Sequence, residues 1–231
     1  MKKKTCVALT GAGISADSGI ATFRGAGGLW EGNRVEDVAT PEAFTRNPQL
    51  VIDFYNARRR QLQQVQPNAA HRALADLEAS WNVHVITQNV DNLHERAGST
   101  QVLHLHGELT KLRSTADEHY VIDWPHDQTL ADCDPQGHRL RPHIVWFGEA
   151  VPLIEPAATL VQQADVVLVI GTSLQVYPAA GLVNYAPVHA RIWLIDPHPA
   201  AVWPGVQIVA ERASVGVPQV VQQLLQEARV Q

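Results

Sequence analysis

Short apolar runs alternate with longer helical stretches along most of this 231-residue chain. Apolar runs of this length are typical of strands that are buried on both faces of a parallel sheet. We expect strands at residues 5–10, 83–87, 102–105, 166–170, 191–195 and 207–209. Because helix-forming sequence separates these runs, the chain is predicted to adopt an α/β fold with a doubly wound, Rossmann-like parallel sheet.

Two segments interrupt this alternation. Residues 31–82 show no strand signal, and Pro41 and Pro48 stand where helices would begin, which indicates an inserted helical lobe. Residues 111–140 are rich in Asp, His, Pro and Gly without clear periodicity, and they predict a small irregular module. We therefore expect a single domain over residues 1–231, with its core at about 1–30, 83–110 and 141–231 and an amphipathic closing helix at 218–228.

The composition excludes several classes of function. With 45% hydrophobic residues the chain can bury a real core, and its net charge of −5 and pI near 6.1 offer no basic surface for nucleic acid. No apolar segment approaches the roughly 20 residues of a membrane span, so no membrane partner is expected. The two cysteines, Cys6 and Cys133, form no disulfide framework, which favours a cytoplasmic location.

The stretch VALTGAGISADSGIATFRG at residues 7–25 joins the first expected strand to a glycine-rich loop. Gly11, Ala12 and Gly13 open a match to G-x-G-x-x-[GA], a pattern that lets a backbone approach a pyrophosphate. A dehydrogenase would place a second strand and a ribose-binding acid about 20 residues further on. Here that distance falls within loop and helix at residues 31–37, so redox chemistry is disfavoured. Alone, the motif fits a tight strand-to-helix turn equally well.

Polar residues follow several expected strands directly. Asn89 and Asp91 come after residues 83–87, Gly171-Thr172-Ser173 follows residues 166–170, and Asp196 follows residues 191–195. The carboxyl ends of parallel strands are where open α/β sheets bind ligands, so these residues are predicted to meet in one crevice. The alternatives are an Asx-turn for Asn89, a helix N-cap for Asp91 and an ordinary turn at Gly171.

Four further stretches carry a resemblance to a known family: TQNVDNLHERAG at 87–98, HLHGEL at 104–109, RPHIVWFGEA at 141–150 and GTSLQVYPAA at 171–180. Together with the glycine loop, in this order and over nearly the whole chain, they resemble the sirtuins, the NAD-dependent protein-lysine deacylases.

The resemblance implies that the acyl oxygen of a modified lysine attacks the ribose carbon of NAD that bears nicotinamide. The products would be nicotinamide, 2'-O-acyl-ADP-ribose and free lysine, and the substrates would be acyl-lysine proteins or peptides. His106 maps to the catalytic histidine, and an imidazole can accept a proton near neutral pH. A structural histidine is the alternative, and His104, on the opposite face of an extended segment, is expected to be one.

The resemblance also assigns binding residues. Asn89 and Asp91 would join His106 in catalysis. The cofactor would contact Gly11, Ala12, Gly13, Ile14, Asp17, Phe23, Arg24, Gln88, Asn89, Asp91, Gly171, Thr172, Ser173 and Asp196. Many sirtuins use Asn at the position of Asp196.

Substrate recognition is expected at two places. The segment Val145, Trp146, Phe147, Gly148 and Glu149 would pair with a peptide as an added strand and line the lysine tunnel, although a plain buried strand is the alternative. Tyr55 and Arg58, at i and i+3 of one helix face, with the small residues of the 26–28 loop, resemble the branch that removes succinyl and malonyl groups. Arg58 would pair with the distal carboxylate of the acyl chain, and some deacetylation would persist. The alternative is that Tyr55 packs on the lobe and Arg58 is solvated.

The small module departs from the family. Most sirtuins carry two cysteine pairs there that bind a structural zinc, whereas this chain has Ser114, Asp117, Cys133 and Gln136 at the matching places. A structural zinc site needs four thiolate or imidazole ligands, so no metal is expected. The alternative is an oxygen and nitrogen ligand set, for which the spacing is irregular, drawn from His119, His126, His138, Asp117 and Asp132. The alternative functions are a general lysine deacetylase, an NAD glycohydrolase or an ADP-ribosyltransferase, and an NAD-sensing module without catalysis.

Overall fold

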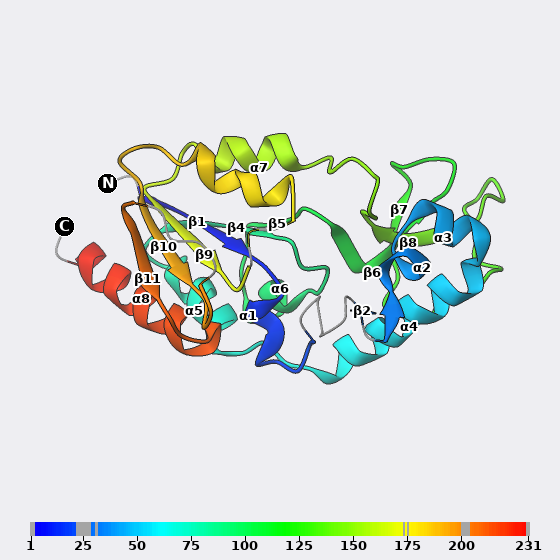
Figure 1. The fold of residues 1–231 in the computed structure, drawn as a ribbon, viewed down its shortest axis with the longest axis horizontal. Helices are drawn as coiled ribbons and strands as arrows, with labels where there is room; N and C mark the ends of the chain where they lie inside the picture. The colour runs from blue at the N-terminus through cyan, green and yellow to red at the C-terminus, as the bar shows by residue number, and fades with distance from the viewer. Residues whose placement is uncertain are drawn as a thin grey trace.

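The computed structural model describes residues 3–21, 29–30, 32–172, 174, 176–199 and 204–229, with the backbone alone for Leu29, Trp30 and Arg229. Within these ranges a six-stranded parallel sheet has the strand order β11-β10-β9-β1-β4-β5 (Figure 1). Its strands are β1 (Thr5–Thr10), β4 (Asn82–Thr87), β5 (Val102–His104), β9 (Val166–Ile170), β10 (Arg191–Ile195) and β11 (Val206–Val209). The chain enters in the middle of the sheet and builds outward on both sides, which confirms the predicted doubly wound fold.

Each face of the sheet is covered by its own helices. Successive residues of a strand point to opposite faces, so Cys6 and Ala8 of β1 pack with α5 (Ala69–Leu77) and α8 (Ala213–Arg229). Val7 and Leu9 face the other side, where α7 (Ile154–Val161) and the 3-10 helix η1 (Ala179–Tyr185) cover them. Helix α5, which the sequence pattern assigned to the helical lobe, thus lies in a layer of the core.

The second part of the molecule combines helices with a small antiparallel sheet (Figure 1). Its helices are α2 (Val35–Val38), α3 (Pro41–Arg46) and α4 (Pro48–Gln64). Its sheet has the strand order β7-β6-β8, with the strands β6 (Gly107–Ser114), β7 (Val121–Asp123) and β8 (Leu140–Ile144). A two-stranded ribbon pairs β2 (Leu29–Trp30) with β3 (Asn33–Arg34). The region predicted as irregular therefore contributes an ordered sheet.

The starts of α3 and α4 follow from local chemistry. Proline is tolerated in the first helical turn because it lacks only an N–H that would stay unpaired there. The preceding side chains cap the helices: Thr40 Oγ1 accepts from the Ala43 amide at 3.0 Å, and Asn47 Oδ1 accepts from the Leu50 amide at 3.2 Å. Both predicted starts, Pro41 and Pro48, are confirmed.

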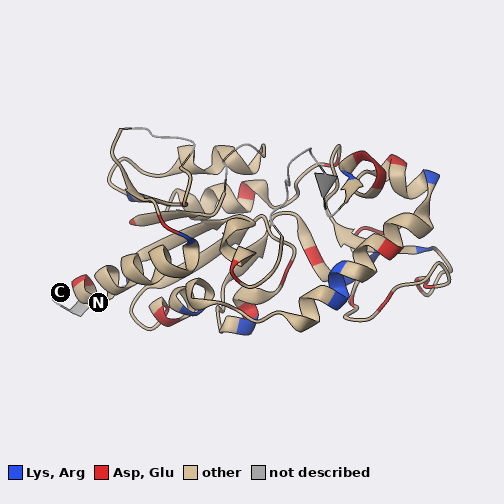
Figure 2. Ribbon diagram, turned by 60° about the horizontal axis from the view of Figure 1, so that its bottom comes forward, with Lys and Arg blue, Asp and Glu red and all other residues tan. Residues whose placement is uncertain are grey.

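Two short helices lie where the strands end. Helix α1 (Gly13–Ala16) follows β1, and α6 (Leu93–Ala97) follows β4, both at the carboxyl edge of the sheet. Positive and negative residues are interspersed over both parts of the molecule (Figure 2). Within the described ranges, every helix is too short or too polar to traverse a lipid bilayer.

Candidate functional site

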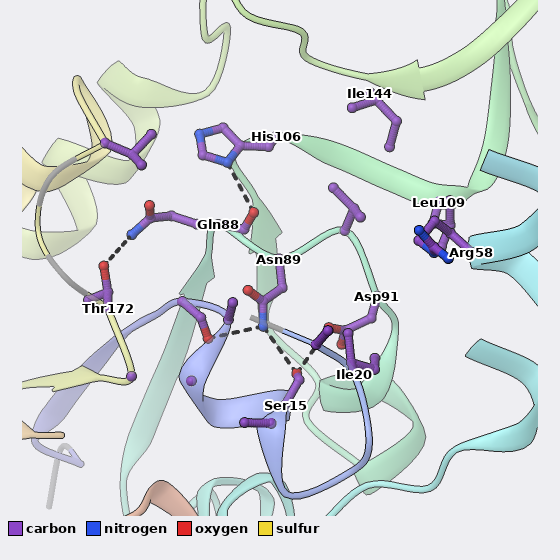
Figure 3. A pocket seen from close by; sticks show the side chains of 18 of the residues that line it. Ser15, Ile20, Arg58, Gln88, Asn89, Asp91, His106, Leu109, Ile144 and Thr172 are labelled. Carbon is purple, nitrogen blue, oxygen red and sulfur yellow. Dashed lines mark hydrogen bonds between the residues drawn. The ribbon is translucent and has the colours of Figure 1, made fainter. Parts of the chain in front are cut away.

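A cavity of about 850 Å³ lies at the carboxyl ends of the central strands, between the parallel sheet and the lobe. It is lined by the loops after β1, β4 and β9, by His106, by Asp196 after β10, and by Tyr55 and Arg58 of α4. The predicted crevice therefore gathers residues that are far apart in sequence. Figure 3 shows the central part of this cavity.

The glycines of the first loop are required by close packing. The Gly13 amide donates to Gly171 O at 2.8 Å, and a Cβ on Gly13 would lie 2.6 Å from Gly171 Cα. A Cβ on Gly11 would lie 2.8 Å from both Gly171 O and Thr172 Cβ. Such distances to backbone atoms exclude any side chain. The two loops thus form a bare backbone cradle in the cavity wall, which suits the close approach of a diphosphate.

The loop after β4 is held by a buried hydrogen-bond network. Asn89 Nδ2 donates to Gly11 O and to Ser15 Oγ, each at 3.1 Å, and Ser15 Oγ donates to Asp91 Oδ2 at 3.0 Å (Figure 3). Gln88 Nε2 reaches across the cavity to Thr172 Oγ1 at 3.1 Å. Burial raises the pKa of Asp91, against the bonds from the Leu93 amide and Ser15. Ser15 is the hub that sequence reasoning did not single out, although it stands within the glycine motif.

His106 lies between β5 and β6 and faces the cavity (Figure 3). Its Nδ1 is 3.0 Å from Gln88 O, and because a carbonyl oxygen can only accept, Nδ1 carries the proton. In the neutral ring, Nε2 then keeps a lone pair. Burial lowers the pKa of His106 below the ordinary imidazole value, although the bond to Gln88 partly opposes this. The residue is thus poised as a base near neutral pH.

Two further buried histidines lie behind the loop. His94 Nε2 is 3.2 Å from Thr10 Oγ1, His71 Nε2 is 3.5 Å from Ser15 Oγ, and the two rings are 4.9 Å apart. Burial lowers the pKa of His71 to about 4 and that of His94 well below its ordinary value. Both are therefore neutral at physiological pH; His71 contacts Ser15 directly, and His94 packs against His71 without adding charge.

The lobe end of the cavity holds Tyr55 and Arg58. Tyr55 is fully buried, and its hydroxyl accepts from Trp146 Nε1 at 2.9 Å. The Arg58 guanidinium lies 5.0 Å from the centre of the Phe54 ring. Figure 3 shows Arg58 and Thr172 at opposite sides of the cavity. The structure thus brings the predicted pair to the same cavity as the glycine loop and His106.

Residues 145–149 form a turn instead of a continuous strand. The amides of Val145 and Phe147 donate to His106 O and Ala39 O, and the Trp146 amide donates to Glu149 Oε2 at 2.7 Å. These N–H groups are thus engaged within the protein, which limits pairing with a peptide as an added strand. Phe147 is exposed, whereas Trp146 is 2% exposed; both are among the residues that line the cavity.

The Glu149 carboxylate serves the framework of this turn. It binds Arg141 at 2.6 Å and Arg113 at 3.1 Å, and the Arg141 guanidinium stacks 3.4 Å from the centre of the Trp146 ring. Burial opposes ionisation of Glu149, but the bond from Arg141 lowers its pKa. Glu149 therefore positions Trp146 while it lines the cavity.

The remaining residues that were predicted to contact a cofactor divide into three groups. Asp196 and Asp17 both line the cavity. The Asp17 carboxylate also accepts from Ser214 Oγ at 2.5 Å, in the first turn of α8, and from Arg212 at 3.3 Å, just before this helix. Ile14 is fully buried in the core and is not among the described lining residues. The predictions at Phe23, Arg24, Ser173 and the 26–28 loop lie outside the described residues.

The small module is organised around Asp134. Its carboxylate accepts from Ser114 Oγ at 2.6 Å, from the amides of Gln136 and His138 at 2.9 Å, and it meets His138 Nδ1 at 3.1 Å. Although burial opposes ionisation, these bonds lower the pKa of Asp134 to about 2. In the described part of the chain no three His, Cys, Asp or Glu side chains are grouped as metal ligands. Cys133, at one of the family's cysteine positions, is exposed.

Known sequences and structures resemble this chain along most of its length. The model of the Sir2 family matches residues 11–178. An NAD-dependent protein deacylase of Aggregatibacter actinomycetemcomitans is 63% identical over 197 residues, which cover 85% of this chain and 95% of the relative. A protein of the same name from Bacteroides thetaiotaomicron is 54% identical over 230 residues, covering 96% of this chain and 98% of the relative.

Solved structures agree with the sequence comparison. The structure of a Sir2 homologue in complex with NAD is 39% identical and superposes with a TM-score of 0.88, covering 98% of this chain and 91% of that chain. A Sir2 complex with a p53 peptide and NAD+ is 28% identical, with a TM-score of 0.77 over 99% of this chain and 95% of that chain.

Proposed function

The chain belongs to the Sir2 family, and we propose that it is an NAD-dependent protein-lysine deacylase that prefers succinyl and malonyl groups and retains some deacetylase activity. The products would be free lysine, nicotinamide and 2'-O-acyl-ADP-ribose. The observation that carries the proposal is the single cavity that joins His106 and the Gln88–Asp91 loop to Tyr55 and Arg58.

The residues present fit NAD. The backbone cradle of Gly11, Gly13 and Gly171 has no room for side chains and offers a surface for the diphosphate. Asp196 follows a strand end, where a carboxylate can accept from a ribose hydroxyl. When bound, NAD supplies the ribose carbon that accepts the acyl oxygen and the nicotinamide that leaves.

The chain's own groups would prepare this chemistry. Asn89 and Asp91 stand in the cavity wall with their side chains fixed through Ser15, so they can orient a ribose hydroxyl and the carboxamide without further ordering. His106 would take the proton of a ribose hydroxyl at Nε2, because the bond to Gln88 O fixes the tautomer that leaves Nε2 free to accept. A structural histidine would not need to face the cavity.

The acyl preference is assigned to the lobe end of the cavity. Tyr55 and Arg58 project from one face of α4, and Leu62, Leu109 and Ile144 supply apolar wall around them. A carboxylate at the end of a four- or five-carbon acyl chain would meet the guanidinium and the phenol in largely apolar surroundings, where a charge-assisted pair is worth more than in water. An acetyl group has no distal carboxylate for either residue to bind.

The test compares Arg58→Met with Arg60→Met. The Arg60 side chain is 57% exposed and pairs with Asp127 outside the cavity lining, so this variant removes the same charge from the same helix. Loss of a charge-assisted bond of about 1.5–3 kcal/mol should lower the ratio of kcat/KM on succinyl peptide to kcat/KM on acetyl peptide about ten- to a hundredfold in Arg58→Met only. An unchanged ratio, or a strong preference of the unaltered enzyme for acetyl peptide, would identify a general deacetylase.

Nicotinamide release separates the remaining alternatives. A deacylase releases nicotinamide only in the presence of acyl peptide, whereas an NAD glycohydrolase releases it from NAD alone. An NAD-sensing module releases none. Transfer of labelled ADP-ribose onto protein would indicate an ADP-ribosyltransferase.

We also propose that the small module folds without zinc. Ser114, Asp134 and His138 bind one another there, which satisfies polar groups that would otherwise need a metal. Metal analysis of purified protein by plasma emission should find well under one zinc per chain. Stoichiometric zinc would refute this part of the proposal.

A further inference from the structure

His104 is a second histidine close to the proposed chemistry. It ends β5, two residues before His106, and it is 8% exposed. Its Nδ1 lies 3.1 Å from Asn89 O, and its Nε2 lies 2.6 Å from Glu95 Oε1 on α6. The ring therefore bridges the loop after β4 to the helix that follows it.

The two partners fix the number of protons on this bridge. A backbone carbonyl and an ionised carboxylate can only accept, whereas a neutral imidazole has a single N–H to donate. Both bonds are formed at once only if His104 is an imidazolium or if Glu95 holds the proton between them. Burial opposes ionisation of Glu95, but the bond from His104 lowers the Glu95 pKa, which favours the imidazolium–carboxylate form.

The bridge acts on the same loop as His106. His106 Nδ1 binds Gln88 O at 3.0 Å, and His104 Nδ1 binds the next carbonyl, Asn89 O, at 3.1 Å. The two histidines thus hold consecutive carbonyls of one loop. The Asn89 backbone amide donates to Thr87 Oγ1 at 3.0 Å, and its side-chain Nδ2 binds Gly11 O and Ser15 Oγ, so a shift of this residue would disturb several bonds at once.

We propose that His104, as an imidazolium paired with Glu95, is a positioning residue that holds the Gln88–Asn89 backbone in the geometry the reaction needs, and that loss of its proton releases this hold. The inference rests on the proposed deacylase reaction. In the deprotonated state, the Nε2 lone pair would face the Glu95 carboxylate, and the two would repel each other. The carbonyl acceptor that fixes the His106 tautomer would shift with the loop.

The surroundings of His104 favour its charged form. Burial lowers its pKa, but the bond and the charge of Glu95, followed by Asn89 O and the charge of Glu108 on β6, raise it above the ordinary imidazole value. Asp91 also faces it, and His94 is neutral because of its burial. Lys111, the nearby cation on β6, is paired with Glu108 at 2.8 Å. His104 should therefore hold its proton to a higher pH than an ordinary imidazole does.

The central variant is Glu95→Gln. The amide that this substitution introduces can donate to a neutral His104 at Nε2 while Nδ1–H still binds Asn89 O, so both bonds survive without a charge. Glu108→Gln is the matched control, because it removes an acidic residue that acts on His104 through its charge and whose carboxylate is bonded to Lys111. His104→Leu removes both bonds, and His104→Gln keeps one N–H donor.

Two measurements test the proposal. Imidazole ¹H–¹⁵N spectra should show His104 of the unaltered protein with both nitrogens protonated at pH 7 and titrating above the ordinary value of about 6.5, whereas in Glu95→Gln it should be neutral with the proton on Nδ1. On the alkaline side of the pH profile, the kcat on acyl peptide should fall as pH rises through the titration of His104 seen in the spectra, in the unaltered enzyme and in Glu108→Gln. In Glu95→Gln that alkaline decline should disappear.

The His104 variants add a separate readout. His104→Leu should lower kcat about ten- to a hundredfold at all pH values with a smaller change in KM, since misplacement of catalytic groups costs rate of this order. His104→Gln should recover part of that loss. A His104 that is neutral at pH 7, a kcat that stays flat through its titration, or an alkaline decline that persists in Glu95→Gln would overturn the proposal. If no acyl peptide is turned over at all, the proposed function fails, and the spectra still decide the protonation of His104.

Discussion

The hydrogen bond between Tyr55 and Trp146 is expected to affect both the stability of the protein and the proposed acyl preference. Trp146 Nε1 donates to the Tyr55 hydroxyl at 2.9 Å, and the two residues are 0% and 2% exposed. Tyr55→Phe removes the acceptor while keeping the ring, so the indole N–H stays buried without it. A buried donor that loses its acceptor lowers the free energy of unfolding by about 1–3 kcal/mol, and we expect about 2 kcal/mol here because both side chains are shielded from water.

For a chain of this size, 1 kcal/mol shifts the midpoint of thermal unfolding by about 2–4 °C, so Tyr55→Phe should lower Tm by about 4–8 °C. The matched variant is Trp146→Phe, and the double variant completes a cycle. Trp146→Phe removes the indole donor. Tyr55→Phe should therefore lower the free energy of unfolding less in the Trp146→Phe variant than in the unaltered protein, by about 1 kcal/mol.

The acyl preference should change with the same bond. The hydroxyl that Trp146 orients is the one proposed to meet the distal carboxylate, so Tyr55→Phe should lower the succinyl-to-acetyl ratio of kcat/KM several-fold. Urea unfolding gives the free energies, and peptide assays give the ratio. A loss of stability below about 0.5 kcal/mol with no coupling in the cycle would show that the bond does not hold Trp146 in place.

Two further predictions follow from the site. Gly107 has φ +82°, and a Cβ there would lie 2.1 Å from His143 O, so Gly107→Ala should displace the hairpin that follows His106. Peptide turnover should show a strong loss of kcat, and urea titration should show a loss of at least about 2 kcal/mol in the free energy of unfolding. Burial lowers the pKa of His106, and the reaction needs its basic form, so kcat/KM should be lost only as pH falls below the ordinary imidazole value of about 6.5; an acid limb above that value would contradict the assigned base.

Much of the core could be predicted from the sequence because a buried strand requires a short run of consecutive apolar residues. The apolar runs at residues 5–10, 166–170 and 191–195 coincide with β1, β9 and β10, and the other three strands differ from the expected ranges by a single residue at one end. The convergence of Asn89, His106 and Gly171 on one cavity follows from the same apolar runs, since parallel strands bring their carboxyl ends to one edge.

The small module could not be predicted in this way. Residues 111–140 have no periodicity, yet they contribute β6 and β7 and pair with β8. Antiparallel pairing there is stabilised by contacts with the lobe and by the bonds to Asp134, and neither leaves a periodic signal. The helix predicted at residues 218–228 begins earlier, at Ala213, because Pro218 removes a single amide donor and the preceding turn packs on the core.

The sequence by itself determined which residues end the strands and therefore which chemistry gathers at the edge of the sheet. Only the tertiary structure decided how those residues are held. Ser15 meets Asp91 across 76 positions, Trp146 meets Tyr55 across 91, and Asp17 meets Ser214 across 197. Periodicity is a property of neighbours along the chain, whereas the partner of a buried donor is set by the packing of separate elements, so these contacts, and with them the protonation states of the histidines, exist only in the folded molecule.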